Sequence, residues 1–285
     1  VVIDVIPSET AGWADVVLPE SIYLERHDDL NVEWFRDPFV AIRQPVVESP
    51  NDQKPNWWMA KTLAEKLGLG AYYPWKDVEE YLSHRVTAAG LSWDRLKRDG
   101  VIRGSKQPIY YEEGVPAEFP TPSGKIEFYS VQLARAGFDP VPKYTRPAAG
   151  PPGSFRLLYG RAPVHSFSRT QTNPILADMM DENMVWVNAD VAMRNGWKTG
   201  DWVQLRNQDG VVSNRIKVLA TERIRTDCVY MVHGFGHTSK MLRRAFGKGA
   251  SDAQLITRYA VDPLMGGTGM NVNFVTIEPA EVVHG

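Results

Sequence analysis

The sequence predicts two regions of different architecture, a mixed α/β portion over residues 1–150 and a β-rich domain over residues 151–285. In the first region, short apolar runs of strand length are followed by stretches with the apolar spacing of helices. In the second, several runs alternate apolar and polar residues and are separated by turn residues. Between the two, residues 139–153 read DPVPKYTRPAAGPPG, a Pro- and Gly-rich composition that predicts a linker and a domain boundary near residue 150.

Length and composition exclude several classes of protein. With 285 residues, of which 43% are hydrophobic, the chain is long enough for one or two domains with a sizeable core. A formal net charge of −2 does not favour nucleic acid or an anionic membrane as the main partner. The sequence holds no apolar run near the ~18 residues of a membrane-spanning helix. Its single cysteine, Cys228, allows no internal disulfide and cannot alone ligate an iron–sulfur cluster, which takes about four cysteines.

The first elements of the α/β portion are two short strands. The opening VVIDVIP predicts a buried parallel strand over Val1–Ile6, and a second apolar stretch follows at Asp15–Leu18. Because the chain opens in mid-strand and without Met, we expect it to be a piece of a longer protein. Ligands of α/β sheets bind at the loops after the carboxyl ends of strands. Asp4 and the Ser8–Glu9–Thr10 cluster occupy that position.

Helices follow in the rest of the α/β portion. Residues 55–68, PNWWMAKTLAEKLG, combine helical apolar spacing with Pro near the start and Gly at the stop. Further helices are predicted over residues 76–88 and 92–98. The segment FPTPSGKIEFYS predicts a turn that leads into a strand at Lys125–Tyr129, after which Ser130 caps a short helix that ends near Gly137.

The C-terminal region reads as strands joined by tight turns. The runs FRLLYG, MVWVN, DCVYMVHGFG and NVNFVTIEP each predict a strand, and Asn188 is expected to cap a short helix that ends at Gly196. Residues 201–220 give a strong hairpin signal, two alternating runs around a turn at Asp209–Gly210. This order of elements predicts a small barrel.

Residues 160–174, GRAPVHSFSRTQTNP, form the most polar candidate site. The segment directly follows a predicted strand and contains no acidic residue. Arg161 and Arg169 suit forked contacts to phosphate or to an exocyclic carbonyl. Hydroxyl and amide side chains are dense here: Ser166, Ser168, Thr170, Gln171, Thr172 and Asn173. The composition fits an anionic, heteroaromatic ligand, and on these residues alone it fits a solvated surface loop equally well.

Two histidines and the cysteine carry weaker signals. His233 and His237 flank Gly-Phe-Gly after a predicted strand, and an H-x3-H pair binds zinc when it lies on a helix. The glycines here predict a loop instead, and no third ligand lies nearby in the sequence, so a loop that offers backbone amides to a ligand is favoured. For Cys228 a buried, inert thiol is favoured over a reactive one.

Taken in order, four longer segments and the end of the chain resemble the molybdopterin oxidoreductases of the dimethyl sulfoxide reductase family. The matching segments are SETAGWADVVLPESIYLE (8–25), TPSGKIEFYS (121–130), YGRAPVHSFSRTQTNP (159–174), VNADVAMRNGWKTGDWVQLRNQDGVVSNRIKV (187–218), and Asp262–Pro263 with the closing NVNFVTIEP. The resemblance spans almost the whole chain and places it at the C-terminal part of a catalytic subunit.

The resemblance implies a fold and a cofactor. Residues 1–150 are expected to form the C-terminal remainder of the family's α/β and mixed domains, and residues 151–285 its six-stranded double-psi β-barrel, the molybdopterin-dinucleotide-binding domain. The cofactor would be molybdenum bis(molybdopterin guanine dinucleotide), which transfers two electrons. The metal ligand and the cysteines of a [4Fe-4S] cluster lie upstream in this family. We therefore assign no catalytic or metal-ligating residue here and expect this chain alone to be inactive.

The resemblance also implies which residues contact the cofactor. Asp4, Thr10 and Asp15 would line one dinucleotide site, with Asp4 accepting hydrogen bonds from guanine, and Gly160 would let the backbone approach the cofactor. Contacts to the pterin and its phosphates would come from Arg161, His165, Ser166, Arg169, Thr170 and Asn173. His233, Gly234, Asn271 and Asn273 would lie near the second pterin.

Within the family, the sequence is most similar to the polysulfide and thiosulfate reductase branch. Glu25 is followed by Arg-His-Asp-Asp-Leu-Asn, which departs from the Gly-Thr-x-x-Asn of formate dehydrogenases and periplasmic nitrate reductases. That branch implies anaerobic respiration on the periplasmic side of the cytoplasmic membrane. Its partners would be the upstream part of the same subunit, an iron–sulfur subunit and a membrane anchor. Alternatives are a tetrathionate, arsenate, nitrate or formate enzyme, a non-redox nucleotide-binding barrel, or a homologue that only scaffolds partners.

Overall fold

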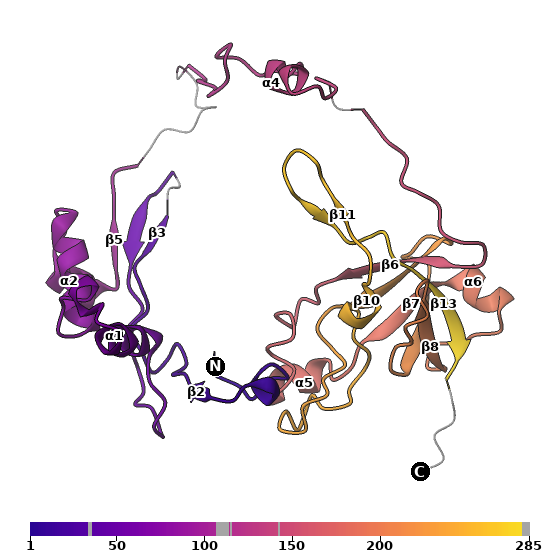
Figure 1. Ribbon diagram of the computed structural model, residues 1–285, viewed down its shortest axis with the longest axis horizontal. Helices are drawn as coiled ribbons and strands as arrows, with labels where there is room; N and C mark the ends of the chain where they lie inside the picture. Colours follow the sequence, from indigo (N-terminus) through magenta and orange to yellow (C-terminus); the bar gives the residue numbers. More distant parts are fainter. Residues whose placement is uncertain (34–35, 107–113, 115, 142, 281–285) are drawn as a thin grey trace. The chain divides into compact units, whose positions relative to one another are not determined.

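The computed structural model describes residues 1–33, 36–106, 114, 116–141 and 143–280 (Figure 1). The chain forms two compact units. The first unit comprises Val1–Val5 and Ala14–Thr145, and the second unit comprises Ile6–Trp13 and Arg146–Gly285. A short piece of the N-terminal sequence, with the 3-10 helix η1 (Ala11–Trp13), therefore belongs to the unit that contains the C-terminal half.

The first unit begins with a two-stranded parallel sheet. In it, β1 (Val2–Asp4) pairs with β2 (Val17–Pro19), with Val2 opposite Val17. The parallel pairing predicted at the start of the chain is present, but the strand is shorter than Val1–Ile6, because a turn bond from the Ser8 amide to the Ile6 carbonyl (2.8 Å) follows. The predicted burial is wrong for the described residues. Ile3 is 43% exposed, since this sheet has two strands here.

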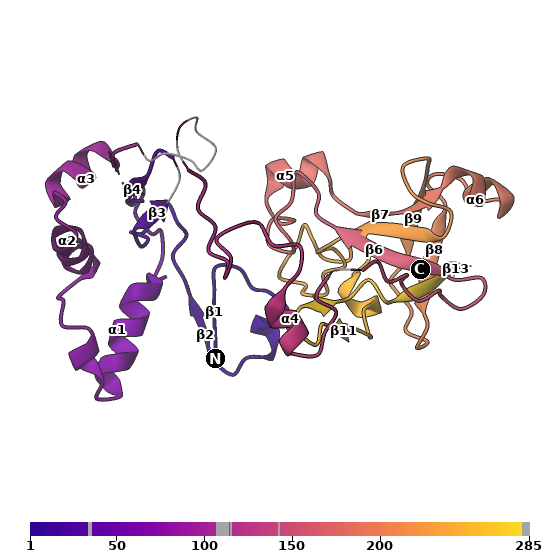
Figure 2. The ribbon, with the colours of Figure 1, turned by 90° about the horizontal axis from the view of Figure 1, so that it is seen from above.

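A three-stranded antiparallel sheet and three helices make up most of the first unit (Figure 2). The strands are β3 (Asn31–Glu33), β4 (Phe39–Ala41) and β5 (Val101–Arg103), and the helices are α1 (Asn56–Lys66), α2 (Val78–Ala88) and α3 (Trp93–Asp99), with the 3-10 turn η2 (Gly70–Tyr72). All three predicted helices are confirmed. A small core joins Val86, Leu96 and Ile102 from α2, α3 and β5.

Caps fix the ends of two of these helices. The Asp77 carboxylate accepts from the Glu80 amide at the start of α2, and the Ser92 hydroxyl accepts from the Arg95 amide at the start of α3. Both bonds satisfy amides that have no partner within the helix. In no part of the chain that the structure describes is a helix long and apolar enough to cross a membrane.

The strand predicted at Lys125–Tyr129 is wrong. The segment forms turns, because the Thr121 hydroxyl donates to the Lys125 carbonyl (2.7 Å) and the Ser123 amide donates to the Glu127 carboxylate (2.9 Å). These side chains take backbone groups that a sheet partner would otherwise bind. The short helix that follows is confirmed as α4 (Val131–Arg135), with the Ser130 hydroxyl accepting from the Leu133 amide.

The second unit is a closed six-stranded β-barrel, as predicted. Around the barrel the strand order is β10-β6-β13-β8-β9-β7. The strands are β6 (Phe155–Gly160), β7 (Met184–Asn188), β8 (Trp202–Asn207), β9 (Ile216–Thr221), β10 (Cys228–Val232) and β13 (Phe274–Pro279). Two pairs are parallel, β6 with β10 and β7 with β9. Closure leaves no open strand edge in the barrel.

The barrel interior follows from the period-2 pattern of the strands. Every second residue points inward, and the inward residues are fully buried, among them Val185 and Val187 of β7 and Val203 and Leu205 of β8. The hairpin turn lies where predicted, with Gly210 at φ +87°. Short elements complete the unit: α5 (Pro174–Met179), α6 (Ala189–Arg194), η3 (Ala253–Leu255) and the hairpin β11 (Ala260–Val261) with β12 (Thr268–Gly269).

Candidate functional site

The candidate site lies at the end of the barrel where β6 and β10 finish. These strands run parallel with Gly160 opposite Val232, so their carboxyl ends share one edge. The His233 amide continues the pairing by donating to the Gly160 carbonyl (2.8 Å). The loops that follow, residues 161–173 and 233–239, therefore leave the barrel side by side.

The two loops are in direct backbone contact. Gly234 has φ +93°, and a Cβ at this position would lie 2.3 Å from the Phe167 carbonyl oxygen. Only glycine fits both the backbone conformation and the space. The same oxygen accepts from the amide of the buried Gln171 side chain (2.5 Å), and the Phe167 ring packs edge-on against His233, with centroids 5.6 Å apart. The loop geometry is thus fixed by packing before any ligand binds.

Cationic side chains are exposed on this surface. The Arg161 guanidinium lies over the Phe167 ring, 4.4 Å from its centroid, and Arg169 and Ser166 are exposed on the same loop. Stacking on an aromatic ring restrains a guanidinium while its N–H groups stay available for an anion. The structure therefore brings Arg161, His233 and the buried Gly234 together at one end of the barrel, and their contacts with a cofactor stay predictions.

His165 and Thr170 shape this loop from within. The His165 ring is 5% exposed, and its Nε2 lies 2.7 Å from the Met180 carbonyl oxygen, so Nε2 carries the proton. The Thr170 hydroxyl then donates to Nδ1 (3.1 Å) and accepts from the Ser166 amide (3.0 Å). No ring nitrogen of His165 is left for a ligand, so its predicted ligand contact gives way to a structural role.

Gly160 and Asn173 also have structural reasons for their identity. A Cβ at Gly160 would lie 2.9 Å from the Tyr230 hydroxyl oxygen, so a larger residue here would require the Tyr230 side chain to move. The Asn173 side-chain oxygen caps α5 by accepting from the Ile175 and Leu176 amides. Neither observation tests a contact with a cofactor, and these contacts stay predictions.

The structure does not bring Asn271 and Asn273 to His233 and Gly234. Asn273 precedes β13, which pairs with the first residues of β6, whereas His233 lies beyond the last residue of β6. Asn273 is fully buried and uses all four hydrogen-bonding positions, on the Thr257 and Arg258 amides and the Arg258 and Met270 carbonyls. Its role is to anchor the base of the β11–β12 hairpin, which leaves it no bond for a pterin.

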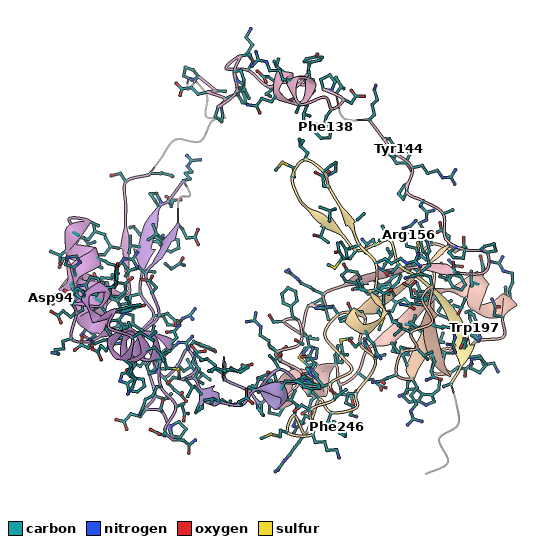
Figure 3. The ribbon with its side chains drawn as sticks, in the orientation of Figure 1. Asp94, Phe138, Tyr144, Arg156, Trp197 and Phe246 are labelled. Carbon is teal, nitrogen blue, oxygen red and sulfur yellow. The ribbon has the colours of Figure 1, made fainter. Side chains whose placement is uncertain are left out.

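Like Asn273, Asn271 lies at the end of the barrel where β6 begins. It is exposed, and its carbonyl accepts from the Arg156 guanidinium (2.5 Å), whose side chain is labelled in Figure 3.

The three N-terminal residues predicted to line a dinucleotide site are divided between the units. Asp4, at the end of β1, and the exposed Asp15 belong to the first unit, whereas Thr10 belongs to the second. The Asp4 carboxylate accepts from the Val5 amide (2.7 Å).

Sequence reasoning missed a pairing between Glu9 and the second loop. The Glu9 carboxylate accepts from the amides of Thr238 (2.9 Å) and Ser239 (3.1 Å) and lies 3.0 Å from Nδ1 of the buried His237. The Ser239 hydroxyl adds a bond to the Pro7 carbonyl (2.9 Å). Burial raises the pKa of Glu9, but bonds from its own amide, Ser239, His237 and Thr238 outweigh it and lower the pKa from 4.5 to about 2.

A buried carboxylate, Asp252, supports the first residues of the same loop. Asp252 is 1% exposed, lies 2.7 Å from Nδ1 of His233, and accepts weakly from the Gly234 amide (3.4 Å). Burial and the charge of Asp252 raise the pKa values of Tyr159 and Tyr230. Among the described residues, no group of three or more His, Cys, Asp or Glu side chains is arranged to hold a metal ion.

Cys228 behaves as a buried thiol. It is 7% exposed at the start of β10, and its Sγ lies 3.4 Å from the Asp227 carboxylate. Burial raises the pKa of the thiol, and the neighbouring Asp227 raises it further. The reactive thiolate is therefore disfavoured, as predicted.

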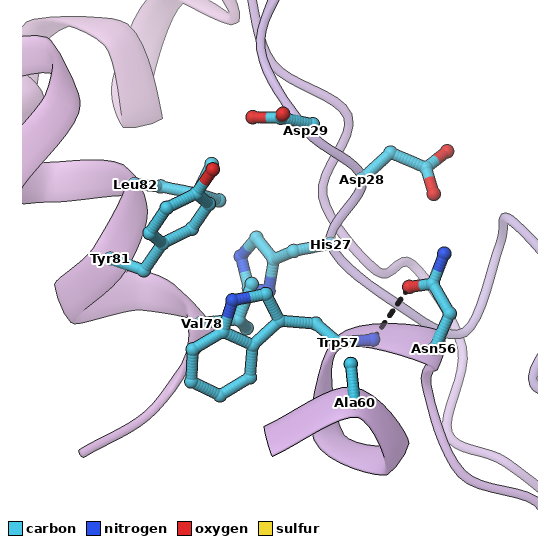
Figure 4. Close-up of a pocket in the computed structure, with 9 residues that line it drawn as sticks. All are labelled: His27, Asp28, Asp29, Asn56, Trp57, Ala60, Val78, Tyr81 and Leu82. Atoms are coloured by element: carbon cyan, nitrogen blue, oxygen red, sulfur yellow. Dashed lines mark hydrogen bonds between the residues drawn. The ribbon is translucent and has the colours of Figure 1, made fainter. Parts of the chain in front are cut away.

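The first unit holds a separate cavity of about 290 Å³ (Figure 4). The rings of His27, Trp57 and Tyr81 gather on one side of it and the carboxylates of Asp28 and Asp29 on the other. Both carboxylates are already paired, Asp28 with Arg26 and Arg43, and Asp29 with Arg85. Burial lowers the pKa of His27. The carboxylates that line this cavity are thus paired with arginines of the same unit.

Two protein families match the chain. The family described as Molydopterin dinucleotide binding domain matches residues 155–274, which contain both barrel loops. The family described as Molybdopterin oxidoreductase matches residues 1–66. The two ranges together cover more than half of the sequence.

Several curated proteins are similar over most of the chain. The thiosulfate reductase molybdopterin-containing subunit of Salmonella typhimurium is 32% identical over 82% of the chain and 34% of its own length. Acetylene hydratase of Syntrophotalea acetylenica is 30% identical over 74% of the chain and 29% of its own length. A putative dimethyl sulfoxide reductase chain of Escherichia coli is 26% identical over 98% of the chain and 38% of its own length. The chain thus spans about a third of the length of these relatives.

A solved structure has the same fold. Acetylene hydratase from Pelobacter acetylenicus superposes with a TM-score of 0.70 and 23% sequence identity, covering 96% of this chain and 39% of that chain. At this identity the likeness bears on the fold alone. It supports the mixed α/β architecture with a closed six-stranded barrel.

Proposed function

Because the chain belongs to the molybdopterin oxidoreductase family, we propose that it forms the cofactor-binding part of an enzyme that reduces sulfur–sulfur bonds, as in thiosulfate and polysulfide. The observation that carries the proposal is the 32% identity to a thiosulfate reductase subunit over 82% of the chain. The departure after Glu25 from the pattern of formate dehydrogenases and nitrate reductases points the same way.

The cofactor of this family is molybdenum bis(molybdopterin guanine dinucleotide), and the second unit fits it on three counts. Arg161, which lies over the Phe167 ring, and Arg169 on the same loop are exposed and suit a pyrophosphate. The absence of a side chain at Gly234 lets the two loops of the site pack backbone against backbone. The buried Nε2 atom of His237 has no hydrogen-bond partner among the described residues.

We assign the binding roles accordingly. Arg161, Ser166 and Arg169 would hold phosphate and pterin groups, and His233, with its Nδ1 fixed by Asp252, would present Nε2 to the ligand. From the 1–15 segment, Asp4 would accept from guanine, and Thr10 and Asp15 would also contact a dinucleotide. When bound, the cofactor supplies two-electron transfer, while these residues bind and orient it.

In the proposed reaction one sulfur–sulfur bond of thiosulfate breaks, two electrons and two protons are taken up, and sulfite and hydrogen sulfide form. We propose that the electrons arrive through a [4Fe-4S] cluster of the intact subunit from an iron–sulfur partner subunit. A quinol-oxidising membrane anchor would supply them, and the enzyme would lie on the periplasmic side of the cytoplasmic membrane.

The test uses the protein expressed from its complete coding region in a host that makes the cofactor. We expect molybdenum with about two guanine nucleotides per metal, and oxidation of a reduced dye with thiosulfate or polysulfide. Nitrate, arsenate and tetrathionate are tried as oxidants of the same reduced dye, formate as a reductant of the oxidised dye, and acetylene by the appearance of its hydration product. Turnover with one of these, and none with thiosulfate or polysulfide, would assign the enzyme to another branch. A protein without molybdenum or guanine would support a non-redox barrel.

The 285-residue chain alone should be inactive. It spans about a third of the length of its relatives. Its one cysteine, Cys228, is buried, and burial disfavours the thiolate form that binds a cluster or a metal. Dye oxidation with thiosulfate by the purified chain would contradict this expectation.

A further inference from the structure

His237 has an unusual environment for a histidine. It is 8% exposed, and its Nε2 atom is buried with no hydrogen-bond partner in the described part of the chain. Buried polar atoms in folded proteins are nearly always paired, because an unpaired one loses its bond to water without replacement. A group outside the described residues is therefore expected to meet this atom.

The proton on this ring can be assigned. Nδ1 faces the Glu9 carboxylate at 3.0 and 3.2 Å, and an ionised carboxylate only accepts hydrogen bonds. The pKa of Glu9, lowered to about 2, keeps it ionised near neutral pH. Nδ1 then carries the proton, and in the neutral ring Nε2 presents a lone pair.

The backbone that carries this ring is held on both sides. The His237 carbonyl accepts from the Gly247 amide (2.9 Å), and its backbone forms a bridge with Phe246, which is labelled in Figure 3. The preceding Gly236 has φ +80°, and a Cβ there would lie 2.4 Å from the Ser251 amide nitrogen. With the backbone held, the contact of Nδ1 with the Glu9 carboxylate sets the direction of Nε2.

His237 also lies where two predicted cofactor-lining segments meet. Glu9 stands between Ser8 and Thr10, and His237 follows His233 and Gly234 in the same loop. The Glu9 contacts join these segments across 228 positions of sequence.

We propose that His237 contacts the dinucleotide cofactor through Nε2, as an acceptor for an N–H or O–H group, and that Glu9 positions it. The partner is an amino or ring N–H of pterin or guanine, or a ribose hydroxyl. A phosphate oxygen does not fit, because it has no hydrogen to donate. This inference rests on the proposed function.

The test compares the cofactor-loaded protein, expressed from its complete coding region, with the same protein from a host that cannot make molybdopterin. Histidine ring nitrogens are labelled with ¹⁵N, and the His237 signals are identified by their absence in His237→Phe. We expect the Nδ1-protonated tautomer in both samples, and a shift of the Nε2 signal on loading. Identical signals in the two samples would overturn the proposal, because Nε2 would then meet water or protein alone.

Cofactor retention gives a readout that does not depend on turnover. His237→Phe keeps an aromatic ring without the acceptor, and we expect release of molybdenum and guanine about tenfold faster, the loss of one hydrogen bond. Glu9→Gln should show a smaller increase and a mixture of ring tautomers. The matched control is Glu278→Gln, which breaks an ion pair with Arg206 (2.7 Å) in the same unit and should release cofactor like the wild type.

The outcomes separate the inference from the proposed function. If the wild type contains molybdenum and guanine, but cofactor retention is unchanged in both variants and the Nε2 signal does not shift on loading, only the His237 inference fails. If the wild type contains neither, the proposed function fails and the inference with it. Thermal unfolding of each variant checks that it is folded. If His237→Phe is not, the His237 signals are identified by their absence in His237→Gln instead, and the wild-type spectra are compared as before.

Discussion

The two units of this chain achieve stability in different ways. The barrel closes on itself, and the inward residues of its six strands, such as Leu205 and Val185, are fully buried. The first unit has open sheets of two and three strands, a small core cluster of Val86, Leu96 and Ile102, and charged pairs at its surface, such as Lys97 with Glu79. Loops on the barrel therefore rest on a rigid base, and that base carries most of the candidate site.

The largest expected effect compares two fully buried leucines. Leu205→Ala in the barrel should cost about 3–5 kcal/mol of unfolding free energy, because closed strands cannot collapse around the new cavity. Leu82→Ala in the first unit should cost about 2–3 kcal/mol, since Leu82 lines the existing 290 Å³ cavity and its surroundings can relax. Urea unfolding, followed by fluorescence, measures both. Equal losses would contradict the proposed difference in rigidity.

A second prediction concerns the contact between the barrel loops. Gly234→Ala should destabilise the second unit by roughly 3 kcal/mol, since it combines backbone strain with a collision on the Phe167 carbonyl. Gly200→Ala is the control: its φ of +97° is similar, but nothing lies within 4 Å of its added Cβ. It should cost about 1 kcal/mol, the strain alone. Similar losses in the two variants, by urea titration, would show that the loops are not in tight contact.

Acid should weaken the second unit through Glu9. The folded-state pKa of Glu9 is lowered from 4.5 to about 2, so its contribution is complete above pH 4.5 and is lost as the pH falls from 4.5 toward 2. The Glu9 side chain is 36% exposed, and screening by solvent reduces the contribution to about 1–2 kcal/mol. Thermal unfolding across this range should be flatter in Glu9→Gln, with Glu278→Gln as the control. If the unfolding temperature of Glu9→Gln depends on pH as steeply as that of the wild type, Glu9 does not cause the loss of stability in acid.

The smallest effect should appear in the first unit and at higher pH. Burial lowers the pKa of His27 below 6.5, despite the opposing charge of Glu79. The folded state therefore binds fewer protons there, and stability declines as the pH falls below 6.5 through the folded-state pKa. His27→Gln should abolish this dependence, whereas the same substitution at the exposed His84 should not. A dependence that persists in His27→Gln would contradict the assignment.

The strands and caps could be predicted from the sequence because their signals are local. Alternation in FRLLYG or MVWVN depends on which face each residue presents to the core, and this is decided within one strand. Ser92, Ser130 and Asn188 cap the helices that begin beside them. Lys125–Tyr129 misled the prediction, because turn-forming Thr121 and Ser123 compete for the same backbone groups.

The candidate site was harder to predict, because hydrogen-bond partners come from distant positions. The loop at 160–174 could be recognised by composition, but not which of its side chains face inward. His165 and Asn273 have the residue types of ligand contacts, yet the side chains of both are hydrogen-bonded within the chain. Asn273 also lies at the other end of β6 from His233. No local signal links Glu9 with His237 or His233 with Asp252, since each pair forms only when the chain is folded.

The place of residues 6–13 in the second unit bears on how this chain can be cut. A fragment that starts at the predicted boundary near residue 150 would retain all six barrel strands but lose Glu9. The amides of Thr238 and Ser239 and the ring of His237 would then lose their acceptor together. A limited digest that cleaves near residue 150 should therefore leave two pieces that stay associated until they are denatured. A minimal expressed barrel would need residues 6–13 supplied in trans or fused through a short tether.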